Sequence, residues 1–246
     1  MLRLLSSHLL PRPRQVTDEN AGAQKKMIIK EQIKRVGIFG GSFDPIHKGH
    51  IAIAEGALKA GVADEVWLMV SPENPLKQGR LNASENDRLA MARLSVAELP
   101  ENIGNRIKVS DFEFKLPRPS YTINTLDRLA ESYPQYRFRW IIGGDNLAAI
   151  EKWVKPDEII GRYGLIIYPR PGDEEDELSK IGETVVILKD PVLQNKCEIL
   201  QNVKLYPHSS TSVRDAIQKG ATDEARSAVG DKVMDYIEEK NLYRID

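Results

Sequence analysis

Residues 35–50 read RVGIFGGSFDPIHKGH, and this stretch decides how the chain begins to fold. The apolar run over residues 35–40 predicts a buried strand, because strands covered on both faces are continuously apolar rather than alternating. Apolar residues then recur at helical spacing over residues 49–60, until Gly61 ends the pattern. The stretch therefore predicts a strand, a glycine-rich turn and a helix in direct succession.

The same alternation continues along the chain. We expect further strands over residues 65–70, 106–110, 137–143, 163–168, 184–188 and 203–206. We expect helices over residues 84–99, 122–132, 211–219 and 231–240, with a loop over 71–83. Strands that alternate with helices predict an α/β fold: a Rossmann-like doubly wound parallel sheet in a single domain, with a small C-terminal helical part. Ligands of such sheets lie beyond the carboxyl ends of the strands, here the loops that follow residues 40, 70, 143 and 206.

Composition excludes several classes of protein. The 246 residues are 41% hydrophobic and 29% charged, with a mean hydropathy of −0.40. No run approaches the ~18 apolar residues that a membrane span requires. The single cysteine, Cys197, excludes an internal disulfide and a multi-cysteine metal site. It fits a reducing compartment, so we expect a cytoplasmic protein that does not bind membranes.

Charge is distributed unevenly. Residues 1–35 contain eight basic and three acidic residues, a net charge of +5, and the remainder of the chain carries −6. An acidic body argues against nucleic-acid binding, which requires many phosphate-neutralising cations. We expect residues 1–34 to be a disordered basic extension and residues 35–246 to form the folded domain.

The turn after the first strand has the features of an anion site. Gly40 and Gly41 let backbone N–H groups approach a ligand closely, and the helix that follows directs its positive end to the same place. His47 and His50 are three residues apart, so both can face that pocket, and Gly49 leaves room for a phosphate against the backbone. The spacing is neither the dinucleotide fingerprint nor a P-loop. Zinc ligation and two core histidines are the remaining alternatives, but the zincin spacing and an evident third ligand are both missing.

Residues 40–50, GGSFDPIHKGH, resemble the signature of the HxGH nucleotidyltransferases. Members of that superfamily transfer a nucleotide from a nucleoside triphosphate to a phosphate-bearing substrate. The short H-x-G-H element also occurs in class I aminoacyl-tRNA synthetases, whereas the longer string is specific. A second stretch, HSSTSVR at residues 208–214, resembles the superfamily's I-S-S-T-x-[IV]-R element, and departs from it at His208, where an apolar residue is usual.

Further stretches are similar to bacterial nicotinate-mononucleotide adenylyltransferases, in the same order over residues 35–244. They are residues 71–77, 119–126, 143–147 and 150–153. The P-S-Y-T element and the G-x-D-x-L…W element separate this group from phosphopantetheine adenylyltransferases and from cytidylyltransferases. The loop at residues 74–77 reads NPLK instead of the commoner P-P-H-[KR], which weakens the transfer of a role to Lys77.

The resemblance implies a role for each matching residue. Expected catalytic residues are His47, His50, Lys77 and Arg214. Expected ATP contacts are Gly40, Gly41, Ser42, Phe43, Gly143, Asp145, Ser209, Ser210 and Thr211. Expected contacts of the mononucleotide are Asp44, Asn74, Tyr121, Thr122 and Trp153, with no metal-ligating residue in the chain. Trp67 and Trp140 lie inside predicted strands, so we expect both in the core.

The implied reaction joins nicotinate mononucleotide and ATP into deamido-NAD with release of pyrophosphate. Mg²⁺ is the implied cofactor, and it would be held mainly by water and substrate oxygens. The implied partners are the two substrates, and formation of a homo-oligomer is left open. Two alternatives remain: another HxGH adenylyltransferase, acting on nicotinamide mononucleotide or phosphopantetheine, and a nucleotide-binding regulator without turnover.

Overall fold

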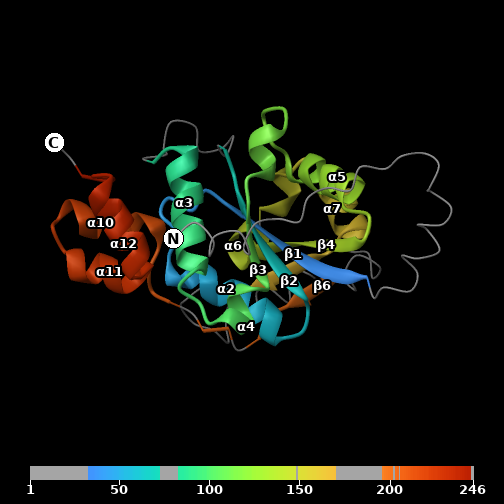
Figure 1. Cartoon of the computed structure of the whole chain (residues 1–246). Helices are drawn as coiled ribbons and strands as arrows, with labels where there is room; N and C mark the ends of the chain where they lie inside the picture. Colours follow the sequence, from blue (N-terminus) through green and yellow to red (C-terminus); the bar gives the residue numbers. More distant parts are fainter. Residues whose placement is uncertain are drawn as a thin grey trace, which may run out of the picture.

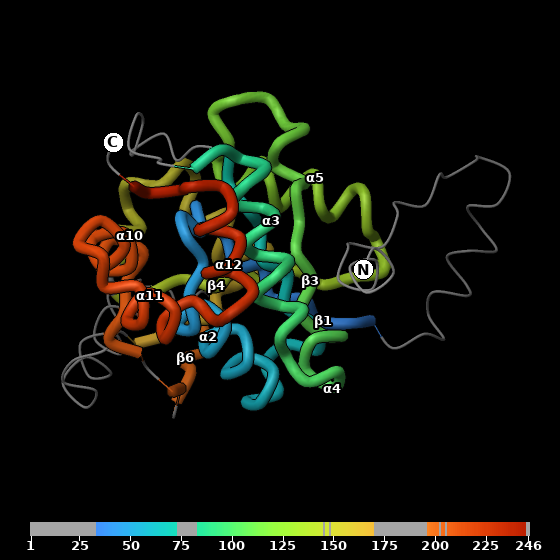
Figure 2. Tube along the Cα trace, turned by 60° about the vertical axis from the view of Figure 1, so that its left-hand side comes forward, coloured from blue at the N-terminus to red at the C-terminus, as the bar shows by residue number. Residues whose placement is uncertain are grey.

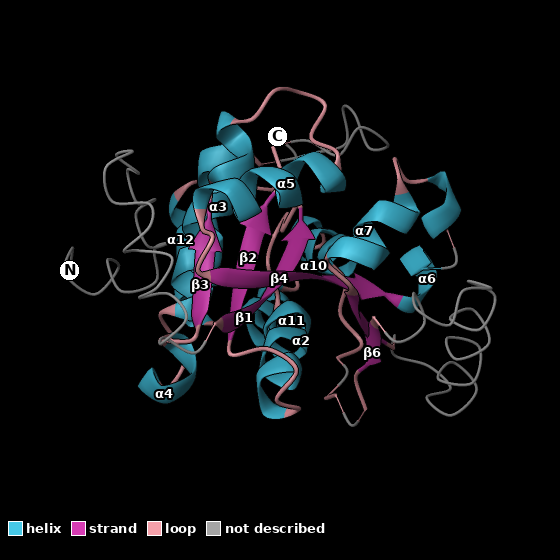
Figure 3. Ribbon diagram, turned by 90° about the vertical axis from the view of Figure 1, so that its right-hand side faces the viewer, coloured by secondary structure: helices cyan, strands magenta, loops and turns pink. Residues whose placement is uncertain are grey.

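The computed structural model describes residues 33–72, 83–147, 149–169, 196–201, 203–204 and 206–244. Six parallel strands form one sheet in the order β3-β2-β1-β4-β5-β6 (Figures 1 and 3). This order reverses direction between β1 and β4, as in doubly wound sheets, so the predicted fold class is confirmed. The strands are β1 (Lys34–Gly41), β2 (Glu65–Val70), β3 (Ile107–Ser110), β4 (Tyr136–Gly143), β5 (Leu165–Tyr168) and β6 (Cys197–Ile199).

Helices cover both faces of this sheet (Figure 3). The α-helices are α2 (Lys48–Lys59), α3 (Glu85–Val96), α4 (Glu101–Gly104), α5 (Thr122–Ser132), α6 (Gly144–Leu147), α7 (Pro156–Arg162), α10 (Ser210–Gln218), α11 (Thr222–Val229) and α12 (Asp231–Glu239). Two 3-10 helices, η4 (Phe112–Lys115) and η5 (Ile150–Lys152), lie in the connections. Most of these helices pack on the sheet through apolar faces rather than forming on their own, because isolated helices of this length are marginal in water.

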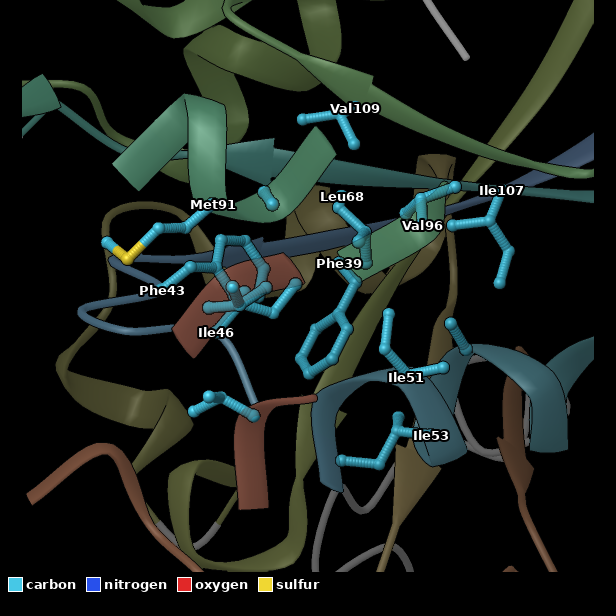
Figure 4. Close-up of a cluster of buried hydrophobic side chains, with 14 of the residues drawn as sticks. Phe39, Phe43, Ile46, Ile51, Ile53, Leu68, Met91, Val96, Ile107 and Val109 are labelled. Atoms are coloured by element: carbon cyan, nitrogen blue, oxygen red, sulfur yellow. The ribbon is translucent and has the colours of Figure 1, made fainter. Parts of the chain in front are cut away.

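Alternating side chains of the strands build two cores, one on each face of the sheet. Phe39 and Leu68 face the core that α2, α3 and the C-terminal helices cover (Figure 4). Ile38 and Trp67 point the other way, into the core beneath α5 and α7. Trp67 is therefore a core residue, as expected, and its side chain is fully buried. Burial on both faces explains why the strands are continuously apolar in sequence.

The sequence-based expectations were wrong or incomplete in the last third of the chain. The predicted strand over 203–206 is absent at residues 203, 204 and 206, and the edge strand is instead β6, paired with β5 through Leu165 and Cys197. Val203 is buried because it packs against Gly56 of α2, and not because it joins the sheet. Helices α4, α6, α7 and α11 were not predicted, and the predicted helix 84–99 ends at Val96. The predicted strand over 184–188 lies outside the described residues.

The expected C-terminal helical part consists of α10, α11 and α12, which gather beside α3 (red in Figures 1 and 2). Buried apolar residues of these helices, including Val213 and Ile237, belong to the same core as Phe39 of β1. The unit is thus continuous with the main domain. No helix in the part of the chain that the structure describes is long and apolar enough to cross a membrane.

One fully buried arginine ties three segments of this fold together. Arg88 of α3 donates from Nη1 to the carbonyl oxygens of Ser42 and Ser71, at 2.6 and 2.8 Å. Its Nη2 donates to the carbonyl oxygen of Pro72 at 2.8 Å, and its Nε to that of Ala83 at 3.3 Å. The loops that follow β1 and β2 are therefore held against the start of α3.

We expect Arg88→Met to lower the free energy of unfolding by at least about 3 kcal/mol. The substitution leaves four carbonyl oxygens without their donor, and hydrogen bonds to a charged group contribute about 1.5–3 kcal/mol each. Urea denaturation followed by circular dichroism measures the loss.

The matched control is Arg93→Met in the same helix. Nε of Arg93 is buried with no hydrogen-bond partner within the described residues, so this change should cost under about 1 kcal/mol. Equal losses in the two variants would contradict the role assigned to Arg88.

Candidate functional site

A cavity of about 330 Å³ opens at the carboxyl ends of β1 and β4, where the strand order reverses. Of the residues predicted to bind ligand, Gly40, Gly41, Ser42, Tyr121, Thr122, Gly143 and Trp153 line this cavity. The crevice at a strand-order reversal is where open α/β sheets bind their ligands. The sequence-predicted loops after β1 and β4 therefore meet at one cavity.

Two tryptophans form a corner of the cavity wall. The rings of Trp140 and Trp153 are 6.5 Å apart and nearly perpendicular, at 82°. Trp140 was expected to be core only, but it both packs in the core and lines the cavity. A β-carbon at Gly40 would lie 2.4 Å from the indole of Trp140, so only glycine lets the indole lie against β1. Two indole faces suit a flat aromatic ligand.

Polar groups that were not among the predicted site residues complete the wall, although some of them lie in the stretches 119–126 and 150–153. Glu113 of η4 is 3% exposed, and Thr125 Oγ1 donates to its Oε1 at 2.7 Å. Burial raises the pKa of Glu113, against the lowering effect of hydrogen bonds from Thr125 and Ser71. Ser120 Oγ is buried at the cavity with no partner among the described residues. Lys152 also lines the cavity, and together with Glu113 it supplies the charge of the described lining.

His47 and His50 do not line the cavity but form the start of α2 beside it. The N–H of Gly49 donates to Nδ1 of His47, and the N–H of His47 donates to Nδ1 of His50, each at 3.1 Å. The two rings are 3.8 Å apart, and that of His50 also contacts the ring of Phe43, with 5.0 Å between ring centroids. Because each Nδ1 accepts a hydrogen bond, a neutral imidazole must carry its proton on Nε2. The cap therefore sets both histidines as Nε2–H donors.

Both histidines are held in that neutral form. Burial, with the neighbouring His208 as the second cause, lowers the pKa of His47 to about 4. Burial also lowers the pKa of His50 well below its ordinary value, with His47 as the second cause. A β-carbon at Gly49 would lie 2.8 Å from Cε1 of His47. The sequence analysis predicted that Gly49 leaves room for a phosphate. In the structure, the imidazole of His47 fills the space beside Gly49 instead.

The start of α10 lies next to this pair. Ser210 Oγ donates to the carbonyl oxygen of Pro45 at 2.9 Å, which joins α10 to the loop before α2. Ser209 Oγ accepts from the N–H of Ser212, so its hydroxyl caps the helix. Arg214 donates to the carbonyl oxygen of Asp44 at 2.5 Å and to Thr211 Oγ1 at 3.2 Å. Two helix N-termini and one guanidinium therefore gather on the loop of residues 43–47, an arrangement suited to an anion.

Asp44 and Phe43 belong to the same loop, but neither lines the cavity. The carboxylate of Asp44 is buried, and its Oδ1 accepts hydrogen bonds from protein groups, the N–H of Ala83 and the hydroxyl of Tyr243. Phe43 is 1% exposed, with its ring against Gly41. Asn74 and Lys77 lie outside the described residues, as does the side chain of Asp145.

Comparison with known proteins agrees with this geometry. The family model described as cytidylyltransferase-like matches residues 38–216. A "probable nicotinate-nucleotide adenylyltransferase" of Bacteroides thetaiotaomicron is 39% identical over 205 residues, 83% of this chain and 91% of the relative. One of Shewanella pealeana is 35% identical over 217 residues, 86% of this chain and 97% of the relative. The solved Plasmodium falciparum nicotinic acid mononucleotide adenylyltransferase complexed with NaAD has the same fold, with a TM-score of 0.67 and 22% identity over 85% of this chain and 97% of that one.

The lowered pKa of His47 predicts how stability depends on pH. Its folded-state pKa lies below the unfolded value of about 6.5, so the unfolded chain binds the proton more readily between pH 6.5 and 4. The stability contributed is full above pH 6.5 and is lost progressively as the pH falls from 6.5 to the folded-state value of about 4, by up to about 3 kcal/mol in total. His47→Asn keeps a capping acceptor but cannot titrate. Urea denaturation at pH 7 and pH 4.5 should show a loss about 2–3 kcal/mol smaller in the variant. The same loss in both proteins would contradict a buried neutral His47.

Proposed function

Since the chain belongs to the cytidylyltransferase-like family, and relatives 32–39% identical to it carry the name probable nicotinate-nucleotide adenylyltransferase, we propose that it transfers AMP from ATP to nicotinate mononucleotide, releasing pyrophosphate. The observation that carries this proposal is the pair of imidazoles locked as neutral Nε2–H donors beside an indole-walled cavity. Donors for phosphate oxygens and a pocket for an aromatic ring then lie side by side at one edge of the sheet.

The chemistry requires donors more than bases. The nucleophile is the phosphate of the mononucleotide, whose second pKa of about 6 leaves it mostly dianionic at neutral pH. No general base is therefore needed, and the barrier lies in bringing an anion in line to the α-phosphorus of another. His47 and His50 donate to phosphate oxygens as charge shifts toward the leaving pyrophosphate. Being neutral donors, they keep this role across the physiological pH range.

The leaving group is proposed to lie at the start of α10. The hydroxyls of Ser209 and Ser210 and the backbone N–H of Ser209 are engaged within the protein, so Ser210 and Thr211 are proposed to offer their backbone N–H groups at the helix N-terminus. Arg214 supplies the positive charge for the β- and γ-phosphates, and Lys77 supplies a second one. Mg²⁺ enters as part of the MgATP substrate. The described residues contain no cluster of three potential metal ligands, so phosphate oxygens and water are its proposed ligands.

The acceptor is proposed to fill the cavity. The pyridine ring stacks on Trp153 in the corner made with Trp140, and Tyr121 of the cavity lining contacts the mononucleotide. Asn74, outside the described residues, is assigned to the same substrate from the sequence alone. Thr122, the first residue of α5, directs a helix N-terminus at the ring's carboxylate, and Lys152 adds a positive charge to the same wall. Gly40, Gly41, Ser42 and Gly143, which line the same cavity, are assigned to ATP, together with Phe43 and Asp145.

We expect His50→Ala to lower kcat by about 10²–10³-fold, the usual cost of removing one donor to developing charge. Release of pyrophosphate at saturating substrates measures kcat, and circular dichroism checks that the variant is folded. A loss of tenfold or less would identify His50 as a capping residue only.

A comparison of acceptor substrates tests the assignment of nicotinate mononucleotide. Nicotinamide mononucleotide would present an amide NH₂ to donors, and an unpaired buried group costs about 1–3 kcal/mol. With the helix N-terminus added, kcat/KM should favour nicotinate mononucleotide by about 10- to 10³-fold. Phosphopantetheine serves as a third acceptor in the same pyrophosphate assay. Equal values for the two mononucleotides would overturn the preference for the acid.

Stacking is tested separately by Trp153→Ala. This change should raise KM for the mononucleotide by about tenfold, since stacking of a base on an aromatic side chain contributes about 1–3 kcal/mol. KM for ATP should stay within about twofold of the original value. An increase in KM for ATP alone would move the pyridine ring to another part of the site.

A further inference from the structure

The last turn of the chain reaches back to the loop between β1 and α2. Tyr243, which follows α12, is 6% exposed, and its hydroxyl donates to Oδ1 of Asp44 at 2.8 Å. These two residues are 199 positions apart in sequence. Burial and the neighbouring carboxylate raise the pKa of Tyr243, so its hydroxyl stays protonated as a donor at every physiological pH.

Asp44 connects this turn to two other segments. Its Oδ1 also accepts from the N–H of Ala83, next to the N-cap of α3, at 3.1 Å. Its backbone carbonyl oxygen accepts from the guanidinium of Arg214 on α10 at 2.5 Å. Asp44 lies three residues before His47, in the loop that the two helix N-termini share. A shift of Asp44 therefore moves both the arginine and the start of the histidine cap.

We propose that Tyr243 and Asp44 are positioning residues of the phosphate site: the hydrogen bond from Tyr243 fixes Asp44, and the carbonyl oxygen of Asp44 aims the guanidinium of Arg214. The inference rests on the proposed function, in which Arg214 holds the pyrophosphate end of ATP. Orientation matters there because a displacement of about 1 Å can cost about 10²-fold in rate. The C-terminal helical unit is then part of the site as well as of the core.

Tyr243→Phe tests the proposal, with Tyr236→Phe as its matched control. The hydroxyl of Tyr236 on α12 donates to Oδ1 of Asp87 on α3 at 2.9 Å, the same kind of bond away from the phosphate loop. We expect Tyr243→Phe to lower kcat about tenfold and to raise KM for ATP several-fold, with KM for the mononucleotide within about twofold. Tyr236→Phe should leave all three within about twofold. Identical kinetics in the two variants would overturn the proposal, whatever their stabilities.

A double-mutant cycle with Arg214→Lys separates positioning from general weakening of the fold. If Tyr243 acts through Arg214, adding Tyr243→Phe to Arg214→Lys should change kcat/KM for ATP by less than about threefold. Independent, multiplying losses would overturn the proposed route. Calorimetric titration of each variant with MgATP gives the same comparison without turnover. Failure of the wild-type chain to form deamido-NAD would refute the proposed function. The calorimetric comparison of MgATP binding would still test the positioning role of Tyr243.

Discussion

The guanidinium of Arg88 lies fully buried where the ends of β1 and β2 meet the start of α3, and it donates to backbone carbonyls of all three segments. Taking a charge out of water costs several kcal/mol, and that cost is met only when the hydrogen bonds are nearly complete. The geometry of the three loops is thereby coupled, because none can move without leaving part of the cation unsatisfied. The hydrogen bond from Arg88 to the carbonyl oxygen of Ser42 fixes the beginning of the loop of residues 43–47. The histidine cap, the contacts of Asp44 and the contact of α10 with Pro45 all depend on the position of this loop.

Much of the architecture follows from local signals in the sequence. Apolar runs identify β1, β2 and β4, and the predicted helix start at residue 84 is confirmed, because Ser84 caps α3 by accepting from the N–H of Asp87. Failures occur where the local signal is weak or has another cause. Strand β6 has only three residues, too few for a pattern, and the buried residues of α11 are mainly alanine. Val203 is apolar for packing against a helix and not for pairing in a sheet.

For the site, too, the sequence predicts some features and only the structure shows the others. The motif at residues 40–50 suggests which histidines face an anion, but not that their Nδ1 atoms close the helix and so fix the tautomer. The place of Trp140 in the cavity wall depends on Gly40 of a neighbouring strand, and the partners of Arg88 and Tyr243 come from distant segments. Such contacts leave no periodic trace, because the residues involved are brought together only by the completed sheet.

The double-histidine cap has a consequence for anyone who re-engineers this chain. Ser, Asp and Asn begin helices better than an aromatic ring does, so a procedure that optimises folding free energy would replace His47 first. It would also see Gly49 as a flexible residue inside a helix and favour alanine, whose β-carbon would collide with that ring. Both edits look like improvements by helix propensity alone. The first would remove the imidazole of His47 and the second would displace it, so the Nε2–H donor would be lost from its place in either case. At these positions, thermostability and chemistry are competing demands on the same atoms, so they should be held fixed in any design.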